Sequence, residues 1–161
     1  MLKITETKYS DLKNIQALWA DGDVMKFVGF PEGLIETDEY MENWYKQIVS
    51  SRPSANHYSI YDDGIYCGET FYSIDPKNKA AAMDIKLFSH ARGKGIASAA
   101  LKFAIGEAFA NGAEKAWVDP NPHNEKAIAL YRCIGMIQKP LPPELYDDEY
   151  PDTIYFEIAK P

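Results

Sequence analysis

A basic, glycine-containing turn is the segment whose residue types most clearly suggest chemistry. It runs from Arg92 to Ala97 and reads RGKGIA. A strand pattern precedes it and a helix of small residues follows, so several backbone N–H groups and the positive helix end should point to one spot. Gly93 and Gly95 let the backbone approach a bulky anion, and Arg92 and Lys94 add positive charge. The turn therefore predicts a cradle for a pyrophosphate.

Two common phosphate-binding motifs do not fit this turn. A Walker A loop needs GxxxxGK[ST], and the first glycine and the final pair are both missing here. The dinucleotide fingerprint GxGxxG would need glycine or alanine at the position of Ser98, together with a parallel βαβ unit. The pattern that does fit is R-x-x-G-x-A, formed by Arg92, Gly95 and Ala97.

A second motif follows about 30 residues downstream of the turn. Asn124, Ala127, Tyr131 and Gly135 match the pattern N-x-x-A-x-x-x-Y-x-x-x-G-F, and Met136 stands in place of its Phe. Met tolerates the volume change, so this departure concerns packing more than chemistry. With both motifs in order, the sequence resembles the GNAT superfamily of N-acetyltransferases. That resemblance implies an acetyltransferase that takes acetyl-CoA as its acetyl donor.

The resemblance also implies which residues hold the donor. The end of the preceding strand should pair with the pantetheine amides as an added strand would, and the turn and first helical residues should bind the pyrophosphate. The helix after Asn124 should line the groove. No metal site is expected, because Cys67 and Cys133 follow no zinc spacing. The cofactor-binding candidates are Leu87, Phe88, Ser89, Arg92, Gly93, Lys94, Gly95, Ile96, Ala97, Ser98, Asn124, Ala127 and Tyr131.

Tyr131 is the candidate acid for amine acetylation. The amine can attack the thioester directly, so no nucleophilic triad is required, and His57, His90 and His123 follow no catalytic spacing. A free phenol has a pKa of about 10 and a thiol about 8.5, so full proton transfer to the thiolate would be uphill by about 2 kcal/mol. Tyr131 can instead stabilise the thiolate by hydrogen bonding to it. The alternative to any catalytic role is that Tyr131 is only a core residue of its amphipathic helix.

Asp84 is the candidate general base. Strand alternation places Met83, Ile85 and Leu87 on one face and Asp84, Lys86 and Phe88 on the other. An Asp on the corresponding strand is proposed as the base of the aminoglycoside 6′-N-acetyltransferases, which this stretch resembles. The alternative is a surface Asp paired with Lys86.

The order of predicted elements indicates an α+β fold. Strands are expected at about 2–5, 58–61, 65–73, 81–88, 116–118, 136–138 and 153–159, with a hairpin turn at Asp62-Asp63-Gly64. Helices are expected at about 95–110 and after the N-caps Ser10, Thr37 and Asn124. Tyr40, Trp44 and Ile48 should line one side of the helix after Thr37. The resemblance implies a GNAT-like, mostly antiparallel, twisted sheet of about seven strands with helices on both faces. A single acetyltransferase domain, residues 1–161, is expected.

The charge of the chain bears on its partners. The formal charge is −7, from 24 acids and 17 bases, which disfavours nucleic acid. Seven acids and one base lie in residues 19–42, and five acids and no base in residues 141–152. The resemblance implies that both stretches can border the acceptor site, where their charge would favour a small cationic amine, aminoglycoside-like or a polyamine. A solvated acidic loop is the alternative for either stretch. The alternatives are a protein N-terminus or lysine, or an acyl-CoA-binding module without turnover. We expect a cytoplasmic monomer or homodimer with no membrane association.

Overall fold

A seven-stranded sheet in the order β1-β2-β3-β4-β5-β7-β6 forms the centre of the computed structural model, which describes residues 1–161. Every neighbouring pair is antiparallel except β4 and β5. The predicted α+β class and mostly antiparallel sheet are thus confirmed. The strands are β1 (Leu2–Glu6), β2 (Ala55–Asp62), β3 (Ile65–Asp75), β4 (Ala80–Leu87), β5 (Lys115–Val118), β6 (Ile137–Lys139) and β7 (Tyr155–Ala159).

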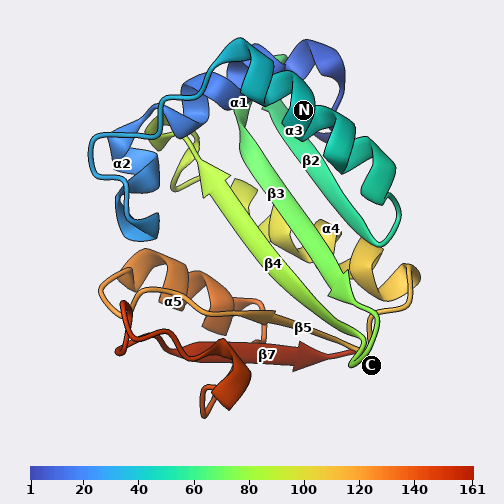
Figure 1. Ribbon diagram of the computed structural model, residues 1–161, viewed down its shortest axis with the longest axis vertical. Helices are drawn as coiled ribbons and strands as arrows, with labels where there is room; N and C mark the ends of the chain where they lie inside the picture. The colour runs from blue at the N-terminus through green and yellow to red at the C-terminus, as the bar shows by residue number, and fades with distance from the viewer.

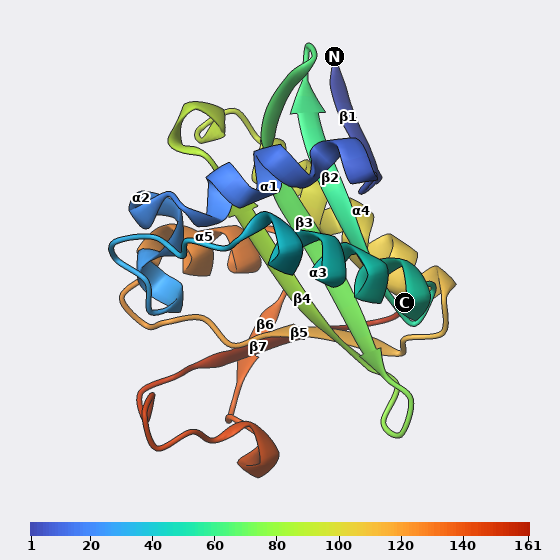
Figure 2. The ribbon, with the colours of Figure 1, turned by 45° about the horizontal axis from the view of Figure 1, so that its top comes forward.

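Helices cover both faces of this sheet (Figures 1 and 2). On one face lie α1 (Leu12–Trp19), the short α2 (Gly22–Met25) and α3 (Asp38–Ser51); on the other lie α4 (Ile96–Ala110) and α5 (Glu125–Cys133). Met83 and Leu87 of β4 pack in the clusters that α4 contributes to, whereas Phe88 packs against the α1 cluster. The predicted division of this strand into two faces is therefore confirmed. No helix combines the length and the apolar character needed to cross a lipid bilayer.

Local sequence signals account for several element boundaries. The β2–β3 turn has Asp63 and Gly64 at φ 48° and 80°, the positive values that a tight hairpin needs. Thr37 caps α3 by accepting from the Tyr40 N–H at 3.1 Å, and Asn124 caps α5 by accepting from the Ala127 N–H at 3.2 Å. These caps lie where the sequence predicts them.

Other details of the prediction are wrong. Ser10 is not a cap, because it lies inside a 3-10 turn, Tyr9–Asp11, that precedes α1. The Asp11 carboxylate closes that turn by accepting from the Lys8 N–H at 2.8 Å. In α3 the predicted inward positions of Trp44 and Ile48 are confirmed, because Ile48 is buried and Trp44 packs against the α1 cluster, but Tyr40 is exposed and Met41 is the buried residue of the first turn. The short α2 was not predicted at all.

The two central parallel strands separate after a few residues, and this opening positions the site. β4 pairs with β3 along its whole length but with β5 only at Ala80, Ala81 and Ala82. Beyond Ala82 the two strands diverge, as Figure 1 shows. The edge of β4 from Met83 to Leu87 therefore faces a gap instead of a neighbouring strand.

Candidate active site

The open edge of β4 presents backbone groups to the gap. The Phe88 N–H donates to Cys67 O at 2.9 Å, which makes these two residues a hydrogen-bonded pair of the β3–β4 ladder. Because pairing alternates along an antiparallel ladder, the N–H and C=O groups of Ile85 and Leu87 point the other way, into the gap. An extended ligand can add there as a strand does. Of the three predicted backbone sites, Leu87 faces the gap, Phe88 uses its N–H inside the sheet, and Ser89 begins a 3-10 turn.

The glycine turn forms an open N-terminus for α4. Gly93 and Gly95 have φ values of 75° and 77°, and nothing lies within 4 Å of where a Cβ would stand on either. Gly95 is the N-cap of α4, and no side chain caps the helix. The first amide N–H groups, of Ile96, Ala97 and Ser98, are therefore available to an anion, and the helix dipole favours one there.

The two cations of the turn are placed differently. The guanidinium of Arg92 donates to Asp23 of α2 at 2.7 Å and to the Leu87 carbonyl at 3.0 Å. The hydrogen bond from Arg92 lowers the pKa of the Asp23 carboxyl, and the hydrogen bond from Lys26 lowers it further. Lys94 is exposed and takes part in no ion pair. Lys94 is thus a free charge beside the cradle, whereas Arg92 also ties the turn to α2.

Tyr131 lies in α5 with its ring packed against Phe156, at 6.1 Å between ring centroids. The side chain is buried, and burial raises the pKa of its hydroxyl, as do the charges of Asp84 and Asp119. Tyr131 is therefore an even weaker acid than the sequence suggests. Donating a hydrogen bond to a developing thiolate suits this phenol better than giving up its proton.

Asp84 is half exposed on the open edge strand. One carboxylate oxygen accepts from the Ile85 N–H at 3.0 Å, and the other forms an ion pair with Lys86. The pairing with Lys86, an alternative to catalysis in the sequence, is thus present. It does not remove Asp84 from the gap, since its charge acts on Tyr131 and on Asp119.

Asp119 is a site residue that sequence reasoning missed. It follows β5 directly, on the opposite side of the gap from Asp84. Partial desolvation and then the charge of Asp84 raise the pKa of Asp119. Two carboxylates whose environments differ in this way are suited to different tasks in acid–base catalysis. The sequence does place Asp119 directly after the predicted strand 116–118, but only the fold shows that this strand lies beside β4 and so brings Asp119 to the gap.

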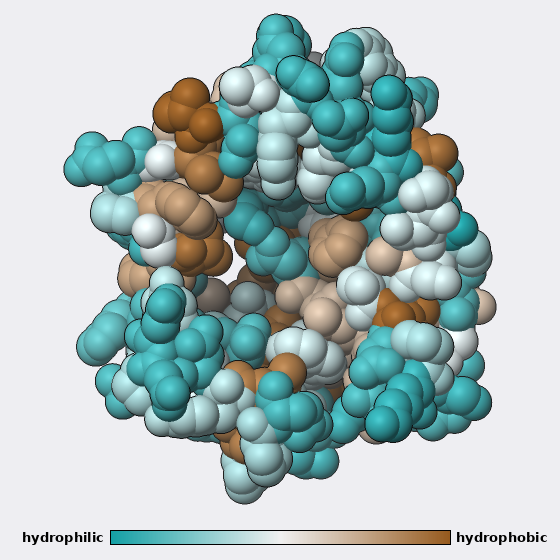
Figure 3. Space-filling model, viewed as in Figure 1, coloured by the Kyte–Doolittle hydropathy of each residue, from teal (hydrophilic) through white to brown (hydrophobic).

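An acidic pocket of roughly 380 Å³ adjoins the gap. It forms where the 3-10 turn Lys26–Val28, the loop after β5 and the segment between β6 and β7 meet, and Figure 3 shows this face of the molecule hollowed. Its carboxylates are Asp119, Asp147, Glu149 and Asp152, and its aromatic side chains are Phe27 and Tyr150.

The two acid-rich stretches contribute unequally to this pocket. Residues 141–152 supply three of its carboxylates. Residues 19–42 line it with Phe27 and Val28 but with none of their acids. Three of those acids have other partners: Asp23 pairs with Arg92, Asp38 with Lys13, and Glu42 accepts from Tyr9.

An opened sheet, an anion cradle at the end of its edge strand and ionisable groups beside the gap together define an acyltransferase. The chain belongs to the GNAT family, because residues 2–137 match the family model described as an acetyltransferase (GNAT) domain. The predicted N-acetyltransferase class is thereby confirmed. No curated protein matches the sequence significantly.

Solved structures share this fold at low sequence identity. A spermidine N-acetyltransferase from Vibrio cholerae, in complex with CoA and spermine, is 20% identical, with TM-score 0.82 over 98% of this chain and 95% of that one. A ribosomal L7/L12 α-N-protein acetyltransferase in complex with CoA is 17% identical, with TM-score 0.83 over 98% and 93%. A phosphinothricin acetyltransferase from Sinorhizobium meliloti, in complex with acetyl-CoA, is 20% identical, with TM-score 0.78 over 98% and 88%. At these identities the likeness shows the fold.

Proposed function

We propose that the chain transfers an acetyl group from acetyl-CoA to a primary amine of a small cationic molecule, such as a polyamine or an aminoglycoside-like compound. The acidic pocket carries this proposal. Four carboxylates converge on a concave site with two aromatic walls, and such a site concentrates ammonium groups and desolvates their carbon skeletons. The solved spermidine acetyltransferase, whose structure holds spermine, supports a substrate of this class.

The donor fits the gap between β4 and β5. The pantetheine arm takes the two outward backbone groups that have no protein partner, the Ile85 carbonyl and the Leu87 N–H, because the Ile85 N–H donates to Asp84 and the Leu87 carbonyl accepts from Arg92. The pyrophosphate takes the N-terminus of α4, with Lys94 and Arg92 beside it. Asn124 has its side-chain oxygen engaged as the α5 cap, so its contribution is to hold α5 and Tyr131 in place. The relatives of similar fold that contain CoA or acetyl-CoA support this placement. The donor site and the acidic acceptor pocket are both built on the same sheet, which supports a single acetyltransferase domain of residues 1–161.

The amine attacks the thioester directly, and different ionisable groups assist the deprotonation of the amine and the departure of the thiolate. The acceptor ammonium loses its proton to the Asp84–Asp119 pair, and Asp119 is the better proton acceptor because its pKa is raised. The amine forms the new C–N bond as the C–S bond breaks. Tyr131 donates a hydrogen bond to the departing thiolate of CoA. This hydrogen bond lowers the free energy of the thiolate without a full proton transfer.

A panel of acceptors tests this proposal. Release of free CoA from acetyl-CoA is followed with polyamines, aminoglycosides, peptides with free N-termini and lysine peptides. We expect turnover with small molecules that carry two or more ammonium groups. Turnover confined to the peptides would contradict the proposed acceptor class, and acetyl-CoA binding with no turnover on any amine would indicate a binding module.

A further inference from the structure

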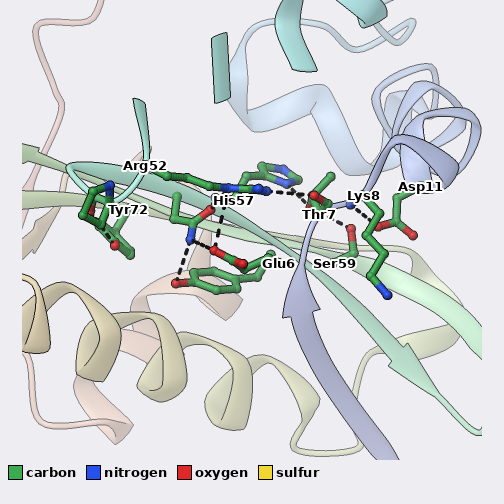
Figure 4. Close-up of polar contacts among 11 residues, drawn as sticks. Glu6, Thr7, Lys8, Asp11, Arg52, His57, Ser59 and Tyr72 are labelled. Atoms are coloured by element: carbon green, nitrogen blue, oxygen red, sulfur yellow. Dashed lines mark hydrogen bonds and ion pairs between the residues drawn. The ribbon is translucent and has the colours of Figure 1, made fainter. Parts of the chain in front are cut away.

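A chain of polar contacts crosses the sheet face beneath α1 and α3. Thr7 Oγ1 lies 2.8 Å from Ser59 Oγ and 2.6 Å from Nδ1 of His57, an arrangement that Figure 4 shows. The other ring nitrogen of His57 contacts the carboxylate of Glu69. All four side chains are buried. His57, which follows no catalytic spacing in the sequence, is here the buried partner of a buried acid.

Glu69 is a fixed negative charge at the end of this chain. Besides His57, it accepts from the indole N–H of Trp19 in α1 at 2.6 Å. Burial alone would raise the pKa of Glu69, but the charge and hydrogen bond of His57, with Lys86 and Trp19, lower it to about 2. The carboxylate is therefore ionised and held from two sides.

Lys86 connects this buried charge to the gap. It is the cross-strand partner of Glu69 in the β3–β4 ladder, and its side chain is only 15% exposed. Burial would lower the pKa of Lys86, but the charges of Asp84 and Glu69 raise it. A covered ammonium is costly unless it is paired. Lys86 is thus an ammonium between two carboxylates, Glu69 sealed in the sheet face and Asp84 at the open edge.

We propose that Lys86 is the positioning residue of the active site, held by the buried His57–Glu69 pair and acting through Asp84. The inference rests on the proposed function. Asp84 has two donors, the Ile85 N–H and the Lys86 ammonium, and together they set the direction of its carboxylate into the gap. Loss of Lys86 leaves one donor, so the carboxylate can rotate away from the acceptor amine. Displacements of this kind slow catalysis strongly even when the fold is intact.

A double-mutant cycle on Lys86→Met and Asp84→Asn tests the inference. With the best amine, Lys86→Met should lower kcat roughly 10- to 100-fold and leave the KM for acetyl-CoA unchanged. Lys86→Arg should restore most of kcat, because it keeps the charge. In the Asp84→Asn background, Lys86→Met should add roughly twofold or less, since residues acting as a unit are not additive. Lys102→Met, at an exposed lysine outside any ion pair, is the matched control.

The outcomes separate the inference from the proposed function. An effect of Lys86→Met that is equally large with and without Asp84 would overturn the positioning role alone. Wild-type protein that turns over no amine would overturn the proposed function and the positioning role with it. Should Lys86→Met fail to fold, as judged by circular dichroism, the same cycle is run with Lys86→Gln, which removes the ammonium charge that pairs with Asp84, and the same loss of additivity with Asp84→Asn is expected.

Discussion

Arg92 Nη1 lies 2.7 Å from Asp23 Oδ2, so a single ion pair joins the glycine turn to α2. The 3-10 turn Lys26–Val28 follows α2 directly, and Phe27 in that turn lines the acidic pocket. The proposed donor site and the proposed acceptor site therefore share one structural link. We therefore expect an anion bound at the N-terminus of α4 to compete with Asp23 for the guanidinium of Arg92.

Replacing Asp23 with Asn should tighten CoA binding. The substitution frees Arg92 and removes a negative charge from the neighbourhood of the pyrophosphate. Because both partners of the ion pair are partly exposed, we expect a decrease in Kd of roughly two- to fivefold, smaller at high salt. Isothermal titration calorimetry with CoA measures it. Asp38→Asn, which breaks a comparable pair with Lys13, is the control, and equal Kd values for the two variants would refute competition.

Tyr131→Phe should lower kcat with little change in the affinity for acetyl-CoA. The ring packing against Phe156 is retained, while the hydrogen bond to the leaving thiolate is lost. A loss of roughly 100-fold is the expected scale for one such group. Steady-state kinetics with varied acetyl-CoA separates the two parameters, with exposed Tyr40→Phe as the control. An unchanged kcat would assign Tyr131 to the core alone.

The activity should fall on the acidic side as Asp119 becomes protonated. The pKa of Asp119 is raised, so its base form is lost at a higher pH than for an ordinary Asp. Asp84→Asn removes the charge that contributes to this shift. The acidic limb of the remaining kcat/KM profile should therefore move to lower pH. If the acidic limb of the kcat/KM profile does not move in Asp84→Asn, another group is the base. The same conclusion follows if Asp119→Asn has an unchanged acidic limb.

Glu69 should make stability depend on pH in the acidic range. Its pKa is about 2 in the folded chain, against 4.5 for an unperturbed Glu, so ionised Glu69 stabilises the fold above about pH 4.5. That contribution is lost as the pH falls toward 2. Urea unfolding measures the free energy of unfolding of the wild type and of Glu69→Gln across this pH range. The two free energies should be similar near pH 2 and should differ increasingly toward neutral pH. A constant difference across the range would contradict the ionised state.

The acidic pocket should control the affinity for the acceptor. Asp147→Asn combined with Glu149→Gln removes two of its charges and leaves Asp84, Asp119 and Tyr131 in place. We expect the KM of a polycationic amine to rise roughly tenfold, with a weaker dependence on salt, because long-range attraction is reduced. Steady-state kinetics at two ionic strengths measures both effects. An unchanged KM would place the acceptor elsewhere.

Local patterns determined much of this protein. The hairpin turn at Asp63, the caps Thr37 and Asn124, and the glycine turn before α4 depend on neighbouring residues, and the sequence places them correctly. The two motifs, each confined to one turn or helix, were enough to assign the family that residues 2–137 match. These features can be recognised in the sequence because the backbone geometry of a turn and the dipole of a helix end depend on only a few neighbouring residues.

The groups around the gap were decided only by the tertiary structure. Asp84 and Asp119 lie at the same gap because β4 and β5 diverge after Ala82, and Arg92 contacts Asp23 across 69 positions of sequence. His57 and Glu69 pair because two neighbouring strands present them on one face. Electrostatic effects depend on distance and burial, neither of which is encoded in local spacing. The sequence alone thus determined the glycine turn at the start of α4, whereas folding decided that its Arg92 pairs with Asp23 of α2.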